Sequence, residues 1–272
     1  MGFVMEPLYY AVSAILLGWH WLFMQLGVLS DGVIWVLAIA GLTVTIRALL
    51  IPLFVKQINS SRNMQLLQPQ IKELQKKYGH DRQKLAEEQM KLWKETGTNP
   101  LASCLPLLLQ MPIFFALFYV INNAAKGKAL GLLDAGDAAS LKDAVFLGGR
   151  IADTFMNSAH VETKLIAMVM VVAMCATQFI TQRQLMSKNM PPDALTGPYA
   201  QQQKILLYVL PIVFAVSGVA FPIGVLIYWT VSNLWTMAQQ FYVIRRNPAP
   251  GTPAEMFHGR SDDLETNRRG NR

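Results

Sequence analysis

The chain has 272 residues and a formal net charge of +7, with 53% hydrophobic and only 15% charged residues. Soluble domains carry about 25% charged residues, so the composition argues against an ordinary soluble protein. Several apolar stretches reach the roughly 20 residues that a helix needs to cross a bilayer core. These stretches are continuous rather than alternating, which is typical of helical spans. We therefore predict an all-α integral membrane protein.

The reactive residue types form no catalytic or metal-binding pattern. Cys104 and Cys175 both lie in apolar stretches, where we expect small apolar side chains and no disulfide framework. The four histidines are far apart, and no nucleophile elbow, zincin motif or Walker loop is present. We expect no enzyme activity, no metal and no cofactor. Because no basic region precedes the first apolar stretch, we also expect no cleaved signal peptide.

The first segment, residues 1–31, allows two interpretations. Leu8–Leu29 is apolar and includes Trp19 and Trp21, which suit a membrane interface. A sixth span is one interpretation of this stretch. However, no Lys or Arg precedes Arg47, so nothing would hold such an N-terminus in the cytoplasm. We favour a helix that lies on the outer surface of the membrane.

The first predicted span occupies residues 32–55, and its apolar run contains Arg47. About 12 Å of helix separates Arg47 from Val55, whereas a snorkelling arginine reaches roughly half of that distance. An arginine at the centre of a span costs about 2.5–3.5 kcal/mol on insertion scales. We therefore expect Arg47 to lie in a polar pocket; a snorkelling arginine with a purely structural effect is the alternative.

Residues 56–98 differ in composition from the spans, with nine basic and five acidic residues. Apolar residues recur at helical spacing from Met64 to Tyr78, and Gly79–Asp81 interrupts this pattern. A second helical pattern follows and ends at Gly97. We predict a cytoplasmic helical hairpin, which would suit a dock for a ribosome, a targeting factor or an emerging chain.

Four further spans are predicted within residues 99–246. Asn99 and Pro100 open the first of them as cap and first-turn proline. Residues 126–160 form an outer loop in which we find no chemistry, and residues 247–272 form a disordered cytoplasmic tail. The four spans cover approximately residues 101–124, 163–183, 205–220 and 223–244.

The basic residues predict the orientation of the spans. Lys and Arg concentrate on the cytoplasmic side of membrane proteins. With five spans, this rule places the N-terminus outside and the C-terminus in the cytoplasm. The basic residues that follow the first, third and fifth spans are Lys56, Arg62, Arg183, Lys188, Arg245 and Arg246.

Uncharged polar side chains are the expected neighbours of Arg47, because no Asp or Glu lies deep in any predicted span. Thr43 lies one helical turn earlier on the same face. Together these side chains predict a wet, positively charged pocket whose natural ligand is anionic and transient. The other candidates are Gln110, Thr177, Gln178, Thr181, Gln182, Ser232, Asn233, Gln239 and Gln240.

Two functions use such a pocket. An anion-binding transporter would use it for a small solute, and a membrane protein insertase would use it for an acidic residue of a nascent chain. Five spans do not divide into inverted repeats, which weakens the transporter interpretation. Solute transport also leaves the basic hairpin unexplained, so the residues favour an insertase.

Three stretches, in order, resemble the YidC-type insertases of bacteria, mitochondria and chloroplasts. TVTIRALLIP resembles the first core helix of that family with its groove arginine. LQPQIKELQKKYGHDRQKLAEEQMKLWKETGTNPLASCLPLLLQMPIFFALFYV resembles the cytoplasmic hairpin and second core helix. FPIGVLIYWTVSNLWTMAQQ resembles the last helix. The resemblance covers residues 35–245 and identifies the chain as a member of this family.

The resemblance implies a hydrophilic groove that is open to the cytoplasm and to lipid and closed on the outer side. It also implies a bacterial plasma membrane location, nascent membrane proteins as substrates and the Sec translocon as a possible partner. Substrate spans would leave along a slide formed by the second and fourth core helices. The implied slide residues are Met111, Pro112, Phe114, Pro211 and Phe214. The implied groove residues are Arg47, Thr43, Gln110, Gln178, Tyr228, Trp229, Ser232 and Asn233.

Some positions depart from the family pattern. Ser217 and Gly218 replace bulky aromatic residues, so this side of the slide is less apolar than in better-known members. Trp229 replaces a tyrosine and loses the hydroxyl but keeps an N–H donor. No large periplasmic domain precedes the core, from which we expect a source that is not Gram-negative. No cysteine lies near the start, so we expect no lipoprotein anchor.

Overall fold

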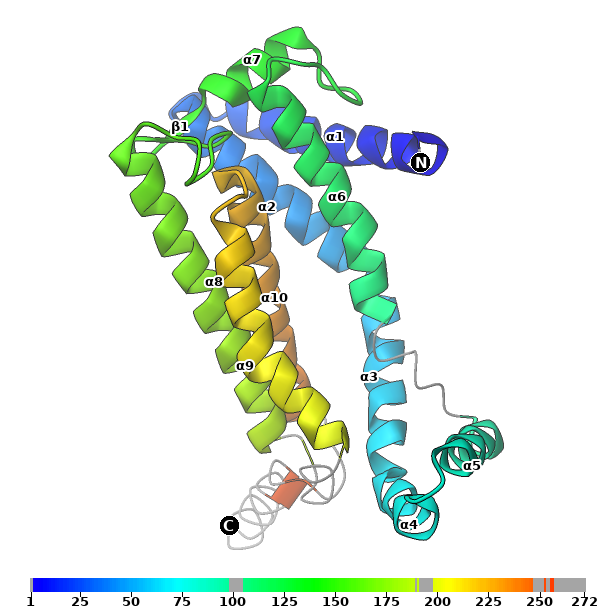
Figure 1. Cartoon of the computed structure of the whole chain (residues 1–272). Coiled ribbons are helices and arrows are strands. Elements are labelled where there is room, and N and C mark those ends of the chain that lie inside the picture. The colour runs from blue at the N-terminus through cyan, green and yellow to red at the C-terminus, as the bar shows by residue number, and fades with distance from the viewer. Residues whose placement is uncertain are drawn as a thin grey trace, which may run out of the picture. The chain divides into compact units, whose positions relative to one another are not determined.

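The computed structural model describes residues 2–97, 105–188, 190, 198–246, 252 and 255–256. Its regular structure is almost entirely helical, which confirms the predicted all-α class (Figure 1). A single short antiparallel pair of strands interrupts the helices in the part of the chain that the structure describes. The elements are α1 (Gly2–Met24), α2 (Asp31–Leu49), α3 (Ile51–Leu66), α4 (Gln68–Tyr78), α5 (Arg82–Glu95), α6 (Leu105–Ala125), α7 (Ala135–Asp143), β1 (Val145–Phe146), β2 (Gly149–Arg150), α8 (Val161–Lys188), α9 (Pro198–Gly218) and α10 (Ile223–Arg246).

The chain folds into two compact units, and α8, α9 and α10 each contribute to both. The first unit comprises Met1–Ile51, Leu107–Phe179 and Leu210–Thr236. The second unit comprises Pro52–Pro106, Ile180–Val209 and Met237–Arg272.

The core of the first unit is built around α2. Trp35, Ile39 and Leu42 are fully buried and recur at intervals of three or four residues, so they share one face of the helix. They belong to the same apolar cluster as Leu117 and Ile121 of α6. This packing holds α2 in the interior of the unit, with Arg47 on its last turn.

The start of α10 is fixed by backbone hydrogen bonds and by a close approach at Gly224. The N–H groups of Ile223 and Gly224 donate to the carbonyls of Asp153 (3.0 Å) and Ile151 (2.9 Å). These bonds satisfy donors that the first turn of a helix otherwise leaves unpaired. A β-carbon at Gly224 would lie only 3.0 Å from side-chain carbons of Ile121 and Ile151, so the glycine permits tight packing here.

A hydrogen-bond network connects α2 and α7 in the first unit, and His20 of α1 packs beside it. The indole N–H of Trp35 donates to Ser140 Oγ at 2.8 Å, and the Ser140 hydroxyl donates to Asp31 Oδ2 at 3.0 Å. His20 Nε2 lies 3.6 Å from Asp31 Oδ1, and the His20 ring lies 4.0 Å from the Trp35 ring. The contact of the His20 ring with Trp35 holds α1 against the start of α2.

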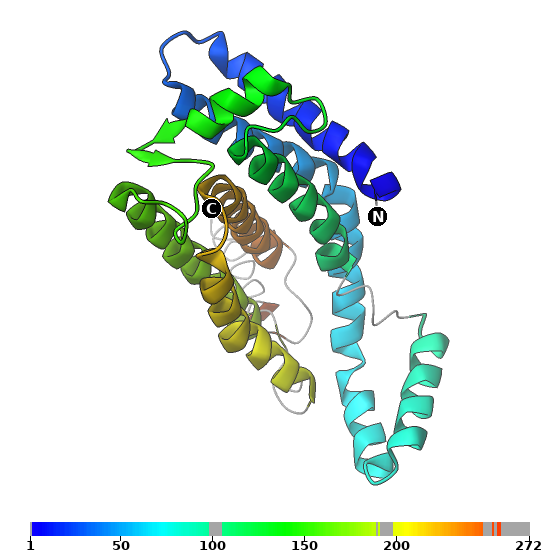
Figure 2. The same ribbon diagram turned by 45° about the horizontal axis from the view of Figure 1, so that its top comes forward.

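The helix α1 packs along α2, and Figures 1 and 2 show the two side by side. Trp19 faces Gly41, where a β-carbon would lie 2.5 Å from the indole ring, and its N–H donates to Thr45 Oγ1 at 2.9 Å. Residues Met5–Met24 are long and apolar enough to cross a membrane. The placement of this segment on the outer surface, rather than as a sixth span, stays a prediction.

Three described helical segments have the length and apolarity of membrane spans: Met5–Met24, Asp31–Leu49 and Val161–Lys188. Two shorter apolar helical segments are Gln110–Ala125 and Gln203–Gly218. These features support a membrane-embedded protein, whereas the count of five spans stays a prediction. The predicted cap at residues 99–100 lies outside the described residues, as does most of the predicted tail.

The first predicted span is broken near its end. We predicted one continuous helix to Val55, but α2 ends at Leu49 and α3 begins at Ile51. Pro52 explains the break, because it has no N–H to donate to the preceding turn and its ring clashes with that turn. A proline is well tolerated in the first turn of a new helix, which is its position in α3.

In the second unit, α4 and α5 cover the segment in which we predicted a hairpin. Met64, Leu67 and Ile71 are buried and pack against Leu92 and Trp93 of α5. The segment from Met64 to Tyr78 is divided between α3 and α4 at Leu67, where we had predicted a single helix.

The turn between α4 and α5 lies at the predicted residues. α4 ends at Tyr78, and Asp81 Oδ1 accepts hydrogen bonds from the N–H groups of Gln83 and Lys84, both at 3.1 Å. Asp81 is therefore the N-cap of α5, a role for which aspartate is preferred.

Residues 126–160, which we predicted to be a loop, contain regular structure. Asp134 caps α7 by accepting a hydrogen bond from the Asp137 N–H, and the Asp137 carboxylate accepts one from the Asp134 N–H, which completes a capping box. The strands β1 and β2 follow and form a tight hairpin.

Candidate functional site

Arg47 lies in the last turn of α2 and is only 9% exposed. Its Nε donates to Ser232 Oγ at 3.0 Å, and its Nη2 donates to the same oxygen. Ser232 belongs to α10 and is 2% exposed. A hydroxyl oxygen has two lone pairs, so it can accept both bonds. A cation of α2 is thus held by α10 inside the first unit.

The break after Leu49 changes the surroundings that the sequence suggested for Arg47. We placed this residue deep within a continuous helix, but α2 ends two residues later. The last carbonyls of a helix carry partial negative charge, so a cation in the last turn is favoured. The end of α2 therefore contributes to the stability of the charge, in addition to the Ser232 hydroxyl.

Gln110 and Tyr228 form a second contact to α10. The side-chain amide of Gln110 on α6 donates to the Tyr228 hydroxyl, and Tyr228 is almost completely buried. Tyr228 and Ser232 are four residues apart on α10, so they lie on the same face of that helix. We name Arg47, Gln110, Tyr228 and Ser232 the Arg47 cluster; its members come from α2, α6 and α10.

Thr43 lies one turn before Arg47 and is also buried. Its hydroxyl donates to the carbonyl of Ile39 in its own helix at 2.7 Å. Thr43 therefore lines the same face of α2 as Arg47 but directs its proton to the backbone.

Asn233 of α10 faces α8 rather than the Arg47 cluster, and Gln178 lies on α8 itself. Asn233 is buried, and its amide donates to the carbonyl of Met174 on α8 at 3.3 Å. Gln178 is half-buried on α8, one turn after Met174. Asn233 follows Ser232 directly, and successive residues of a helix point about 100° apart, which explains why it contacts α8 instead.

Three of the predicted residues meet in an aromatic cluster. The Trp229 ring lies 4.9 Å from the Phe114 ring of α6 and 4.5 Å from the Phe214 ring of α9. Phe221 completes the cluster at 5.9 Å from Trp229 and 5.5 Å from Phe114. Trp229 therefore bridges the two helices that we predicted to form the slide.

The other predicted slide residues lie on the same two helices. Met111 is exposed on α6, and the prolines Pro112 and Pro211 lie inside α6 and α9. The carbonyl of Pro211 accepts a hydrogen bond from the Cys175 thiol at 3.3 Å.

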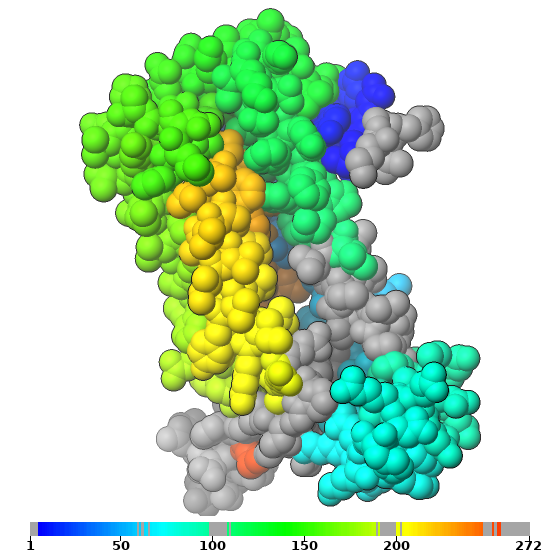
Figure 3. All heavy atoms as spheres, viewed as in Figure 1, coloured from blue at the N-terminus to red at the C-terminus, as the bar shows by residue number. Residues whose placement is uncertain are grey.

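The outer face of α9 in the first unit is apolar and exposed. Figure 3 shows α9, in yellow, on the surface of the molecule. Ile212, Val213 and Val216 are exposed on this helix, whereas Phe214 is half-buried against Trp229. In a membrane-embedded protein such a face contacts lipid, so α9 has a lipid-exposed face and a face toward the aromatic cluster.

Two contacts of this site were not predicted from the sequence. Phe221 packs on Trp229, although it was not among the candidate site residues, and the Met174 carbonyl accepts a hydrogen bond from the Asn233 amide. The sequence carries no local signal for either contact. Among the residues that the structure describes, no His, Cys, Asp and Glu side chains form a group of three that could hold a metal ion.

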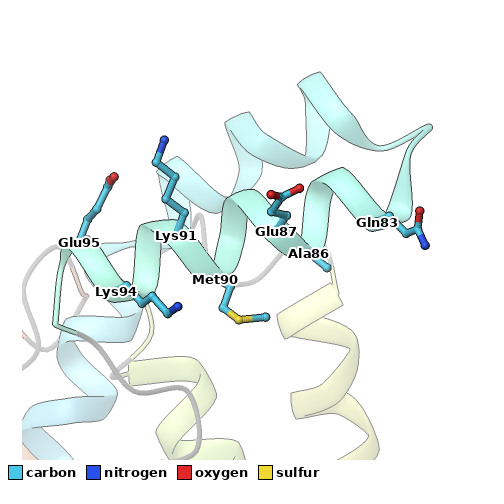
Figure 4. Close-up of a pocket in the computed structure, with 7 residues that line it drawn as sticks. All are labelled: Gln83, Ala86, Glu87, Met90, Lys91, Lys94 and Glu95. Atoms are coloured by element: carbon cyan, nitrogen blue, oxygen red, sulfur yellow. The ribbon is translucent and has the colours of Figure 1, made fainter.

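An open pocket on one face of α5 is a second candidate surface, in the second unit (Figure 4). Its walls are mixed, with the exposed apolar side chain of Met90 among residues of both charges. The lining residues are Gln83, Ala86, Glu87, Met90, Lys91, Lys94 and Glu95.

Comparison with known proteins shows which protein family this chain is similar to. The family model described as "60Kd inner membrane protein" matches residues 28–250. A protein of Streptomyces avermitilis named membrane protein insertase YidC is 47% identical over 253 residues, which cover 90% of this chain and 59% of that protein. A protein of the same name from Tropheryma whipplei (strain Twist) is 37% identical over 268 residues, covering 92% of this chain and 86% of that protein.

A solved structure is also similar. Its description reads "Active YidC insertase crystal structure with the first transmembrane domain resolved". It is 28% identical with a TM-score of 0.54, and the match covers 84% of this chain and 46% of that one. The chain thus spans about three fifths of the Streptomyces relative and under half of the solved chain.

Proposed function

The chain belongs to the 60Kd inner membrane protein family, in which the curated relatives are named membrane protein insertase YidC, and we propose that it inserts nascent membrane proteins into the bilayer and helps them fold. The observation that carries the proposal at residue level is the buried pair of Arg47 and Ser232. No nucleotide or metal takes part in the proposed mechanism.

In this mechanism the Arg47 cluster lies at the base of a hydrophilic groove that is open to the cytoplasm and to lipid. Arg47 attracts an acidic residue in the segment of the substrate that must cross the membrane. A charge within the bilayer costs several kcal/mol, so opposite charges and polar groups within reach lower the barrier for that segment. Gln110, Tyr228 and Ser232 supply these polar groups, together with Thr43.

The apolar part of the substrate leaves sideways along the slide. Burial of apolar area is worth about 25 cal/mol per Å², so a substrate helix gains free energy when it moves into lipid. Met111 and Pro112 on α6 and Pro211 on α9 line the proposed path, with Phe114 and Phe214 on either side of Trp229. The exposed apolar face of α9 supports a path that leads to lipid.

The proposed topology places the N-terminus outside and the C-terminus in the cytoplasm of a bacterial cell, with five spans. The basic residues that follow α2, such as Lys56 and Arg62, support this orientation. We propose that α4 and α5 lie in the cytoplasm and recruit ribosomes or targeting factors, and that the Sec translocon is a further partner. The mixed charge on the α5 pocket suits a protein or nucleic-acid surface rather than lipid tails.

Site-specific photo-crosslinking during translation tests the proposed function. A photoreactive amino acid at Met111 or Phe114 should form adducts with a single-span nascent chain that carries an acidic N-terminal tail. The same amino acid at Lys142 on α7, an exposed position, is the matched control. Adducts at the control position alone contradict the proposed path. If a small anion protects Arg47 from chemical modification and no nascent-chain adducts form, the result would instead favour an anion-binding transporter.

A deletion tests the proposed recruiting role. Removal of residues 65–90 deletes α4 and most of α5. We expect ribosome binding and insertion rate to fall, while the variant still integrates into membranes. An unchanged insertion rate contradicts recruitment by these helices.

A further inference from the structure

The hairpin of β1 and β2 presents an exposed leucine at its tip. Phe146 pairs with Gly149, so Leu147 and Gly148 are the two residues of the loop. Their φ angles are +52° and +87°. Positive φ at both positions is what a type I′ hairpin turn requires.

Leucine is an unfavourable residue at this position for two independent reasons. A branched, bulky residue with positive φ is strained, and Asn, Asp or Gly usually occupies the first position of such a turn. Leu147 is also 75% exposed, so the fold gains little apolar burial from it. The folded protein alone therefore gives no reason for an apolar side chain here.

The hairpin rests on the first turn of α8. A β-carbon at Gly148 would lie 3.2 Å from Glu162 Cγ, and the Arg150 N–H donates to Thr163 Oγ1 at 3.3 Å. Leu147 is thus next to the N-terminal end of α8, and Figure 2 shows the hairpin projecting at this end.

An exposed apolar stripe begins at the same end of α8. Val161, Leu165, Val169 and Val172 are 60–64% exposed and recur every three or four residues, so they share one face. Val161–Lys188 has the length and apolarity of a membrane span. At 1.5 Å per residue its 28 residues extend about 42 Å, more than a hydrocarbon core of about 30 Å. The stripe is therefore a lipid-contacting face, and Leu147 lies at its end.

We propose that Leu147 anchors the hairpin in the lipid bilayer, at the boundary between acyl chains and headgroups of the leaflet where α8 begins. Arg150, exposed on β2, lies at headgroup depth and contacts lipid phosphate. An apolar side chain beside a cation is the combination that binds membrane interfaces. The anchor fixes the depth at which α8 enters the membrane. It depends on membrane embedding only, and not on the proposed insertase function.

Spin labelling in proteoliposomes tests the anchor. In a chain with Cys104→Ser and Cys175→Ser, a nitroxide is attached at Leu147→Cys. We expect the label to be relaxed strongly by oxygen, which concentrates in lipid, and weakly by a water-soluble nickel chelate. The controls are Val169→Cys on the α8 stripe, expected to report lipid, and Ala139→Cys on an exposed position of α7, expected to report water.

Two results overturn the proposal. One is a label at position 147 whose accessibilities to oxygen and to the nickel chelate equal those of the label at position 139. The other is dipolar broadening between labels, which shows that a second copy of the chain covers the leucine.

A second variant separates anchoring from folding. Leu147→Asn suits positive φ and should leave the thermal unfolding temperature in detergent unchanged or higher. In proteoliposomes it should shift a label at Val161→Cys toward greater nickel accessibility. An unmoved Val161 label contradicts the anchoring role, because the hairpin is then still folded but has no effect on the depth of α8.

Discussion

Arg47 and Ser232 are 185 residues apart in the chain, and the Arg47 guanidinium donates two hydrogen bonds to the one Ser232 hydroxyl. Both side chains are buried, so the pair joins α2 to α10 in a region where an unsatisfied charge would be costly. This pair sets the orientation of the guanidinium relative to Tyr228, which lies one turn earlier on α10. Substitution of either Arg47 or Ser232 should therefore affect both the stability of the fold and the proposed insertion activity.

Substitution of Ser232 by alanine should lower the free energy of unfolding by about 1–3 kcal/mol, because it leaves donors of a buried charged group without this acceptor. Ser232→Thr keeps the hydroxyl and should lose less. Thermal unfolding in detergent measures both. Ser217→Ala is the control, because the Ser217 hydroxyl donates only within α9, to Val213 at 2.8 Å and Phe214 at 3.4 Å. Equal losses for the two alanine variants would show that the Arg47 contact contributes nothing.

The charge of Arg47 should matter more to activity than its shape. Arg47→Lys keeps a cation and should retain much of the insertion of a single-span substrate with an acidic tail, although it loses the two-pronged contact to Ser232. Arg47→Ala and Arg47→Glu should lose most of it. The measurement is insertion in a strain depleted of its own insertase. The substrate with its acidic residue replaced by asparagine is the control and should be far less sensitive to these changes. Full insertion activity of the Arg47→Ala variant would show that the charge of Arg47 is not needed.

The sequence was sufficient to predict the helical class and a membrane-embedded protein, and it included Ser232 among the polar candidates near Arg47. Both follow from physical limits: apolar runs of about 20 residues are typical of helices that cross a bilayer, and a buried cation with no acidic neighbour in the spans needs polar partners. The sequence could not identify Ser232 as the partner among the polar candidates. That choice depends on how α2 and α10 are rotated relative to each other, which long-range packing decides.

Two other differences between the predicted and observed helices have signals in the sequence. Pro52 follows Arg47 closely and marks the start of a new helix, yet the apolar run continues past it and suggested one span. Asp134 and Asp137 have the spacing of a capping box, which predicts α7. The β1–β2 turn could not be predicted in this way, because Leu147 and Gly148 are not a residue pair that is typical of a tight hairpin turn.

Gly224 should tolerate no larger side chain without loss of stability. Gly224→Val adds three carbons where a β-carbon alone lies 3.0 Å from Ile121 and Ile151 and 3.2 Å from Ile39. Overpacking of this kind typically costs about 1–3 kcal/mol. Gly18→Val on α1 is the matched control, because a β-carbon added at Gly18 would have nothing within 4 Å. Thermal unfolding of both variants in the same detergent gives the comparison, and equal midpoints would refute the close approach of α10 to its neighbours.

Trp229 should contribute both to stability and to the proposed lateral path. Trp229→Ala removes the ring that lies between Phe114 and Phe214. Truncation of a fully buried tryptophan costs about 3–5 kcal/mol, and we expect less here because Trp229 is partly exposed. Trp229→Tyr keeps an aromatic ring in contact with both phenylalanines and should retain most of the stability.

The two Trp229 variants also distinguish packing from function. If the ring acts only as a structural bridge, nascent-chain adducts at Phe114 should fall in proportion to the amount of folded Trp229→Ala protein. If the ring instead closes the path until a substrate arrives, adducts per folded molecule should increase in this variant and stay unchanged in Trp229→Tyr. Crosslinking yields normalised to folded protein, measured by resistance to proteolysis in membranes, decide between the two. We expect the increase, because Trp229 contacts residues of both helices that would have to separate around a substrate span.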